Sequence, residues 1–496
     1  MKLNVWVLVS IAIVTVLVSI LWLRLHAFLA LMLAGLLVAV GTPPAALQTH
    51  AEALVERGSL EAEEVSGFVS QAAPARLAAA FGKTAGQIGI LIALASIIGA
   101  CLLQSGAARV IIEAALGVIG QRHAAIALAA SSFVLGIPVF FDTVFYLMVP
   151  LARTLRQRTG RDYVLFILAI MAGGSIAHSL VPPTPGPLQI AEIIGVDLLT
   201  LMLAGLVVGG LSSTFSLGVA WWLNRRVDVP LRSLGEGVDE FAEGEADLDA
   251  EQRVGDPSRP RRSGPPVLLA LAPILLPVLL IAGQTATKMS MGTVPLSESA
   301  TATELLVGWL QLLGDKNVAL GIATAIALAM LYWAPPTLDR SRLVSAALAS
   351  GGVIILITSA GGAFGAMLGQ AGIAEAMSGI RASVPGLMLL PIAFAVTTAI
   401  RTLQGSATVA MITAAGILQG LAAGGGLPFH PVYLALAIGA GSKPVSWMND
   451  SGFWVMCKMS GMTESEGLRT ISPFTVGMGL STLFWTMLGA WLVPLV

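Results

Sequence analysis

The sequence has little charge and almost no cysteine. Asp, Glu, Lys and Arg make up 11% of its 496 residues, hydrophobic residues make up 56%, and the net charge is −1. A soluble protein of this length typically carries about twice that charged fraction. A nearly neutral chain gives no reason to expect nucleic acid as a partner. The two cysteines, Cys101 and Cys457, lie far apart in apolar segments, so we expect free thiols and neither a disulfide framework nor a metal site.

Common catalytic and nucleotide-binding motifs are also missing. The sequence has no Gly-x-x-x-x-Gly-Lys-Ser/Thr loop and no His-Glu-x-x-His pair, and its histidines are scattered. ATP-driven transport by this chain alone and zinc-dependent proteolysis in the membrane are therefore disfavoured. We expect no enzyme activity and no cofactor.

Long apolar runs dominate what is present. The run from Val5 to Leu23 is long enough to cross roughly 30 Å of hydrocarbon. Residues 1–23 could instead form a secretory signal, but the run is long for a signal core and a second apolar run follows. The 54 glycines and 26 prolines fit helices that pack closely and break often. The composition therefore predicts an all-α, multi-pass protein of the inner (plasma) membrane, surrounded by the lipid bilayer.

A polar segment divides the chain into two similar halves. Residues 224–265 combine both signs of charge with Gly and Pro, which is typical of a disordered linker; an acidic regulatory module is the alternative. Residues 1–223 and 266–496 then share matches at a nearly constant offset. The matched positions are Gly99–Gly106 with Gly365–Gly372, Gly174-Ser175 with Gly441-Ser442, and Ser179 with Ser446.

Charge bias predicts opposite orientations for the two halves. Clusters of arginine are expected in the cytoplasm, among them Arg153/Arg156/Arg158/Arg161, Arg225/Arg226 and Arg340/Arg342. The predicted first-half elements are spans at 4–23, 26–41 and 87–104, a hairpin at 124–152, a broken span at 163–190 and a span at 197–223. The second-half elements are spans at 266–284, 317–334 and 343–369, a hairpin at 386–421, a broken span at 430–457 and a span at 472–494. Inverted repeats, each with a re-entrant hairpin and a broken helix, are typical of secondary transporters. The loop at 42–86 is expected outside, with a surface helix near Ala51–Glu64.

Two polar segments stand out in the first half. In Gly136–Thr143, Asp142 follows two aromatic residues, and a buried carboxyl is suited to carrying a proton; a helix cap at the hairpin tip is the alternative. In Ser175–Pro187, four prolines within six residues prevent a continuous helix. His178 can exchange protons near neutral pH, or it can be a hydrogen-bonded structural residue. These segments predict proton coupling by Asp142 and His178, and solute binding by Thr143, Ser175, Ser179, Thr184 and Gly186.

Two further polar segments lie in the second half. In Arg401–Ala410, Arg401 can neutralise a carboxylate through a two-pronged hydrogen bond, form an internal ion pair that holds the hairpin, or lie at the membrane interface. In Gly439–Gly452, Gly and Pro break the span, and interhelix hydrogen bonding is the alternative to solute binding. Lys443 either reaches the interface or adds positive charge beside the site. These segments predict solute binding by Arg401, Gln404, Gly405, Ser406, Thr408, Ser442, Ser446 and Asn449, and proton coupling by Asp450.

At these residues the sequence resembles the gluconate:proton symporter (gluconate permease) family of the ion transporter superfamily. The resemblance is carried by "LHAFLALMLAGLLV" from Leu25, "GIPVFFD" from Gly136, "HSLVPPTPGP" from His178, "QGSATVA" from Gln404 and "NDSGFW" from Asn449. It implies uptake of a small hydroxylated monocarboxylate, such as gluconate, driven by the proton gradient. It also implies a homodimer with an elevator-type architecture, in which a transport domain moves against a scaffold.

The sequence departs from this family at several polar positions. Asp142 stands where the family commonly has Glu, and Thr184 where it has a second His. Lys443 and Pro444 replace apolar residues, and Trp447 replaces a residue that is often His. These departures leave the substrate open.

The sequence therefore predicts a secondary active transporter that imports a small organic anion with protons. Hairpin tips and helix breaks would enclose the solute at mid-membrane. Three alternatives remain: a sodium-coupled carrier of a carboxylate or amino acid, because broken helices can also coordinate Na⁺; an intramembrane enzyme; and a channel.

Overall fold

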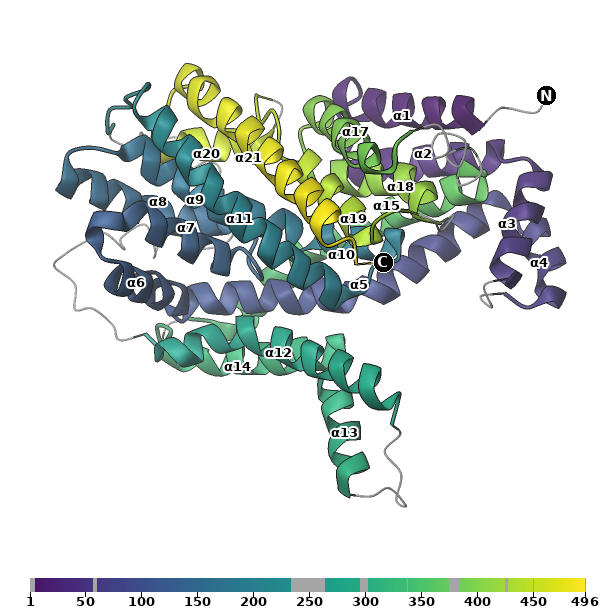
Figure 1. Ribbon diagram of the computed structural model, residues 1–496, viewed down its shortest axis with the longest axis horizontal. Helices are drawn as coiled ribbons and strands as arrows, with labels where there is room; N and C mark the ends of the chain where they lie inside the picture. Colours follow the sequence, from purple (N-terminus) through teal and green to yellow (C-terminus); the bar gives the residue numbers. More distant parts are fainter. Residues whose placement is uncertain are drawn as a thin grey trace.

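The protein is a bundle of helices in the computed structural model (Figure 1), which describes residues 5–56, 60–232, 264–294, 302–336, 338–373, 376, 384–423, 427–448 and 450–495. Within these ranges there are no strands, and eight helices are long and apolar enough to cross a membrane. The α-helices are α1 (Val5–Leu21), α2 (Ala27–Gly41), α3 (Pro44–Glu56), α4 (Val65–Ser70), α5 (Ala73–Gln104), α6 (Ala107–Ile119), α7 (Ala124–Leu135), α8 (Phe141–Thr159), α9 (Tyr163–Leu180), α10 (Pro185–Ile194), α11 (Leu198–Asn224), α12 (Val267–Met291), α13 (Ala302–Leu313), α14 (Lys316–Ala329), α15 (Arg340–Gln370), α17 (Leu389–Gln404), α18 (Ala407–Ala423), α19 (Pro431–Gly441), α20 (Ser451–Ser460) and α21 (Glu464–Leu492).

Each of the four interruptions predicted from the sequence separates two helices. Gly136 and Pro138 lie between α7 and α8, and Pro182 and Pro183 lie between α9 and α10, where the missing N–H and fixed φ of proline end a helix. Gly405 ends α17 with a left-handed φ of 84°, which glycine adopts without steric cost. The segment between α19 and α20 contains the fourth break. Local sequence chemistry therefore accounts for all four helix breaks.

The helices on either side of these breaks pack in an equivalent way in the two halves of the chain. Helix α9 packs against α7, α8 and α11, and α19 packs in the same way against α17, α18 and α21. Helix α10 packs against α18, and α20 packs against α8, so each broken span ends on the opposite hairpin. The long helices α5 and α15 also pack against each other.

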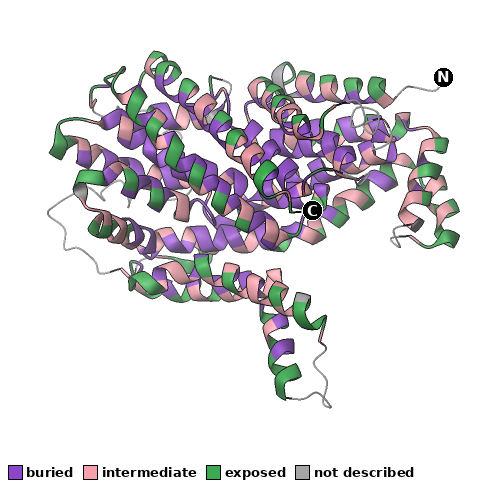
Figure 2. Cartoon of the chain, in the orientation of Figure 1, coloured by how far each residue is buried: buried purple, intermediate pink, exposed green. Residues whose placement is uncertain are grey.

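Burial distinguishes the central helices from the peripheral ones. In the most apolar part of Tyr163–Ile194, 83% of residues are buried, against 28% in Val267–Lys288 of α12. Figure 2 shows the same contrast between the middle of the bundle and the layer formed by α12 and α14. Helix α13 projects from that layer (Figure 1). A span buried to this extent faces protein rather than lipid.

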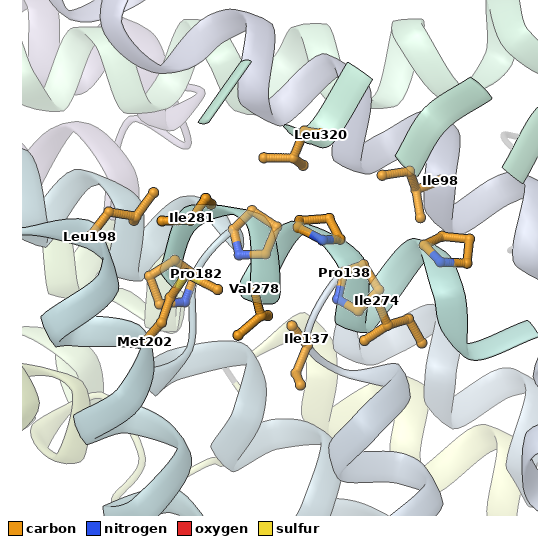
Figure 3. Close-up of a pocket in the computed structure, with 13 residues that line it drawn as sticks. Ile98, Ile137, Pro138, Pro182, Leu198, Met202, Ile274, Val278, Ile281 and Leu320 are labelled. Carbon is orange, nitrogen blue, oxygen red and sulfur yellow. The ribbon is translucent and has the colours of Figure 1, made fainter. Parts of the chain in front are cut away.

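A small apolar cavity lies between the α12–α14 layer and the breaks of the first hairpin and the first broken span (Figure 3). It has a volume of about 20 Å³, which is room for roughly one water molecule. Pro138, Pro182 and Pro183 line it from one side, and Pro273 and Pro277 of α12 line it from the other. None of the predicted polar site residues lines this cavity.

Polar contacts join the helix ends that the charge bias assigns to the cytoplasm. Arg232, which follows α11, forms a two-pronged ion pair with Glu466 at the start of α21, with N–O distances of 2.6 and 2.8 Å. The Tyr163 hydroxyl at the start of α9 donates to the Ser460 carbonyl at the end of α20, at 2.7 Å. The Asn224 side chain accepts from the N–H of Leu165. These ends therefore lie at one side of the bundle, as the predicted trace requires.

The structure differs from the predicted trace in several places. Helix α5 begins at Ala73 rather than near residue 87, and the expected external loop contains α3 and α4. The charge in the first turn of α5 is buried Arg76, whose guanidinium donates to the side chain of Gln370 at 2.5 Å and to the Ala39 carbonyl at 2.9 Å. These hydrogen bonds allow the helix to begin before the apolar run that was predicted to span the membrane. Helix α13 was not predicted, because its apolar run is short. Most of the predicted linker, residues 233–263, lies outside the described residues.

The contact between α7 and α9 gives a first test of the fold. A Cβ added to Gly173 would lie 2.0 Å from the Ala129 carbonyl oxygen, which is a backbone atom that cannot rotate away. We expect Gly173→Ala to destabilise the protein by about 1–3 kcal/mol, as overpacking typically does. The matched control is Gly210→Ala in α11, where a Cβ would meet nothing within 4 Å. Thermal unfolding in detergent should show a loss for the first variant only, and equal melting temperatures would contradict this packing.

Candidate functional site

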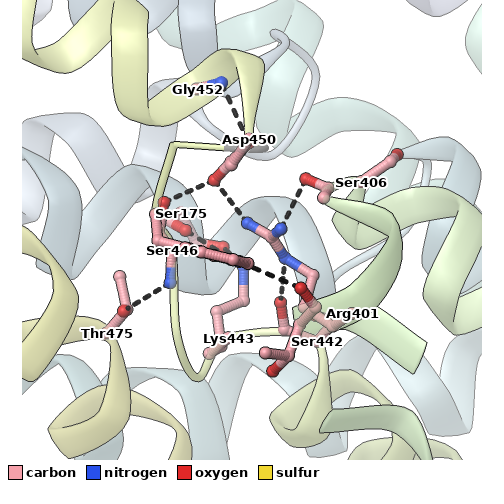
Figure 4. Close-up of polar contacts among 12 residues, drawn as sticks. Ser175, Arg401, Ser406, Ser442, Lys443, Ser446, Asp450, Gly452 and Thr475 are labelled. Carbon is pink, nitrogen blue, oxygen red and sulfur yellow. Dashed lines mark hydrogen bonds and ion pairs between the residues drawn. The ribbon is translucent and has the colours of Figure 1, made fainter. Parts of the chain in front are cut away.

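Arg401 holds the second hairpin and the second helix break together (Figure 4). It lies in the last turn of α17 and is only 4% exposed. Its Nε donates to the Ser442 carbonyl at 3.2 Å, one terminal nitrogen donates to the Gly405 carbonyl, and the other pairs with the Asp450 carboxylate. The guanidinium therefore ties the second hairpin tip to both ends of the second helix break. In this structure it forms the internal ion pair that was one of its predicted roles.

Asp450 is the acceptor on which this network converges. Its carboxylate also accepts from the Ser446 hydroxyl and, at 2.9 Å, from the N–H of Gly452, where it caps α20. Ser446 is held in turn by α21: its N–H donates to the Thr475 hydroxyl at 3.2 Å, and its carbonyl accepts from the Ser472 hydroxyl at 2.5 Å. The sequence analysis did not identify Ser472 or Thr475, although Pro473 between them marks an irregular turn of α21.

The backbone of this break is strained. Val445 has a φ of 58°, in the left-handed region that a β-branched residue rarely adopts. A strained conformation of this kind persists only where the surrounding contacts hold it in place. Strained residues are found most often at functional sites. The contacts of Ser446 with α21 hold the backbone in place on one side of Val445.

Lys443 links the second break to the first broken span. Its ammonium donates to the Ser175 carbonyl at 2.6 Å and to the Ser175 hydroxyl at 3.0 Å (Figure 4). The adjacent Gly174 packs against the ring of Phe141 in the first hairpin, and the His178 ring lies edge-on to Phe140 with centroids 6.0 Å apart. A chain of contacts therefore connects parts of all four predicted polar segments, from Phe141 through Ser175 and Lys443 to the break held by Arg401.

Three polar side chains in this region have unpartnered atoms. Both amide atoms of Gln404, the hydroxyl of Ser179 and Nδ1 of His178 are buried and have no hydrogen-bond partner among the described residues. Gln404 is 6% exposed. Buried polar groups in native structures are nearly always paired, so each such group needs an explanation.

Several predicted residues have local partners or lie at the edge of the cluster. The Thr184 hydroxyl donates to the Val181 carbonyl at 2.8 Å, the Ser442 hydroxyl donates to the Gly439 carbonyl at 2.7 Å, and the Ser406 hydroxyl accepts from the N–H of Val409 at 3.4 Å. The remaining three are Thr143 and Thr408, which are half-buried, and Gly186, which packs closely against Met411. Asn449 lies outside the described residues.

The expected burial of Asp142 is wrong. Asp142 is exposed and lies in the first turn of α8, where the helix dipole favours a negative charge. The ring of Phe141 turns toward Gly174 of α9, which leaves the following residue on the outer side of the helix.

No metal site accompanies this cluster: among the described residues, no group of three His, Cys, Asp or Glu side chains could hold a metal ion.

Comparisons with known proteins agree with this architecture. The model of the family described as "GntP family permease" matches residues 58–492. The chain is 30% identical over 410 residues to the inner membrane permease YgbN of Escherichia coli K12, covering 81% of this chain and 85% of the relative. It is 28% identical over 455 residues to the low-affinity gluconate transporter of the same strain, covering 90% of this chain and 89% of the relative.

The fold is also similar to that of a solved transporter. The YdaH transporter of Alcanivorax borkumensis aligns with a TM-score of 0.55 at 15% identity, covering 88% of this chain and 91% of that one. Because the family model matches most of the sequence, this chain belongs to the GntP permease family, and it is a multi-pass transporter of the inner membrane rather than an enzyme.

Proposed function

We propose that this permease imports gluconate or a related small hydroxylated monocarboxylate, as a secondary active transporter driven by protons. The gluconate transporters among its relatives support the substrate class. The site offers the matching chemistry: buried cationic side chains for a carboxylate, and hydroxyl and amide groups for the hydroxyls of a sugar acid.

The unpartnered amide of Gln404 is the observation that carries this proposal. A buried polar group without a partner costs about 1–3 kcal/mol. The cost is understandable where a ligand supplies the missing hydrogen bonds. Gln404 lies one turn from Arg401 on the same face of α17, beside the ion-paired break, so a solute bound there would contact the second hairpin and both broken spans.

The same network supports the proposed proton coupling. Protonation of Asp450 would remove its negative charge and weaken its pair with Arg401, which holds the hairpin tip to the break. His178 offers an unpartnered ring nitrogen in the first broken span, and Asp142 is exposed and can take a proton from water. Coupling requires that the protonated state binds the solute more tightly than the unprotonated one.

We infer that residues 1–223 and 266–496 are inverted repeats joined by the 224–265 linker. The equivalent packing of α9 and α19, and the reciprocal contacts of α10 with α18 and of α20 with α8, support this division. By analogy with carriers of this type, the hairpins and broken spans would move as one body in a homodimer.

Uptake into proteoliposomes tests the proposed function. We expect accumulation of labelled gluconate when an inward proton gradient is imposed, and none when a sodium gradient is imposed at equal pH. Accumulation under the sodium gradient alone would identify a sodium-coupled carrier instead. Equilibration without counterflow exchange would identify a channel.

Gln404→Leu separates solute binding from stability. Because no hydrogen bond is lost, we expect an unchanged or higher melting temperature, while the Kd for gluconate rises at least about tenfold, as loss of a hydrogen bond implies. The matched control is Gln419→Leu, whose amide donates to the Gly365 carbonyl at 2.6 Å and to the Gly416 carbonyl at 2.8 Å. That variant should lose stability and keep its affinity. Wild-type affinity in Gln404→Leu would overturn the placement of the site.

A double-mutant cycle tests the ion pair. Arg401→Gln leaves the Asp450 carboxylate buried without a cation in contact, and loss of one partner in a buried pair costs about 3–5 kcal/mol. We expect the double variant with Asp450→Asn to lose less stability than the two single losses added together. Additive losses in chemical denaturation would show that the two side chains do not interact.

A further inference from the structure

Lys443 is a buried cation that the ion pair of Arg401 and Asp450 does not neutralise. It is 6% exposed, and among the described residues no carboxylate lies within ion-pair distance of its ammonium. Its hydrogen bonds go to the neutral carbonyl and hydroxyl of Ser175. An uncompensated buried charge is costly. We therefore expect the charge of Lys443 to be balanced by an anion that is not one of the described residues.

We propose that Lys443 neutralises the carboxylate of the transported solute and selects monocarboxylates, an inference that rests on the function proposed above. Arg401 is less able to do so because its charge is already balanced by the Asp450 carboxylate with which it pairs. An ammonium has three N–H donors, and two of those of Lys443 are used by Ser175. The third is available for a carboxylate oxygen.

The charges of the cluster specify how many carboxylates fit. Arg401 and Lys443 contribute two positive charges and Asp450 one negative charge, so the described cluster carries a net charge of +1. One carboxylate brings this sum to zero. An uncharged polyol leaves it at +1, and a dicarboxylate brings it to −1. Selection between them follows because unbalanced charge is disfavoured away from water.

The groups around Lys443 suit the remainder of such a solute. Ser175, His178 and Ser179 lie within two turns of α9, and Ser179 lies close to Gly439, one turn before Lys443. The unpartnered Ser179 hydroxyl and His178 nitrogen can bond hydroxyl groups next to the bound carboxylate.

Binding of three matched compounds to the purified protein tests the inference. Gluconate, glucitol and glucarate have the same carbon chain length and carry one, no and two carboxylates. By titration calorimetry, we expect the wild type to bind gluconate at least about tenfold more tightly than either of the others. In Lys443→Gln we expect the Kd for gluconate to rise at least about thirtyfold and the preference over glucitol to disappear, whereas Lys443→Arg should keep the preference.

The control is Lys458→Gln, which removes an exposed cation from α20 and should leave all three affinities unchanged. The comparison of glucitol with gluconate in the wild type applies even if a Lys443 variant fails to fold. Equal wild-type affinity for glucitol and gluconate, or an unchanged preference in Lys443→Gln, would overturn the role of Lys443 and leave the proposed function standing. A wild type that binds none of the three would overturn both.

Discussion

The ion pair between Arg401 and Asp450 is the interaction on which the rest of this structure depends. At membrane depth an interrupted helix exposes backbone groups that water cannot reach, so protein groups must satisfy them. The Arg401 guanidinium does this for the carbonyls of Gly405 and Ser442 while pairing with the residue that caps α20. One side chain therefore allows a hairpin tip and a broken span to meet in an apolar bundle.

The two halves of the chain depend on each other at the same place. Each broken span ends on the opposite hairpin, and Lys443 bonds Ser175 across the halves. A change in charge at the second break would therefore act on a residue that is in direct contact with the first broken span. This arrangement suits the proposed transport cycle, in which solute binding and proton transfer would act on one connected cluster instead of two separate sites.

The sequence was most informative where a single residue determines the backbone conformation. Prolines 182 and 183 and Gly405 allowed the breaks to be placed, and the polar composition of Arg401–Ala410 indicated a buried polar segment. Contacts made far along the chain could not be predicted in this way. The choice among the three roles of Arg401 depends on Asp450, the burial of Arg76 depends on Gln370, and the exposure of Asp142 depends on which way Phe141 turns. Short α13 lacked a run long enough to suggest a span.

The central claim is that the junction of the second hairpin with the two broken spans is where the solute binds. An experimental structure determined in the presence of gluconate tests it most directly. We expect density for the acid between the amide of Gln404 and the ammonium of Lys443, with its carboxylate toward Lys443. Gluconate bound elsewhere in the bundle, with this junction as closed as it is without solute, would contradict the account.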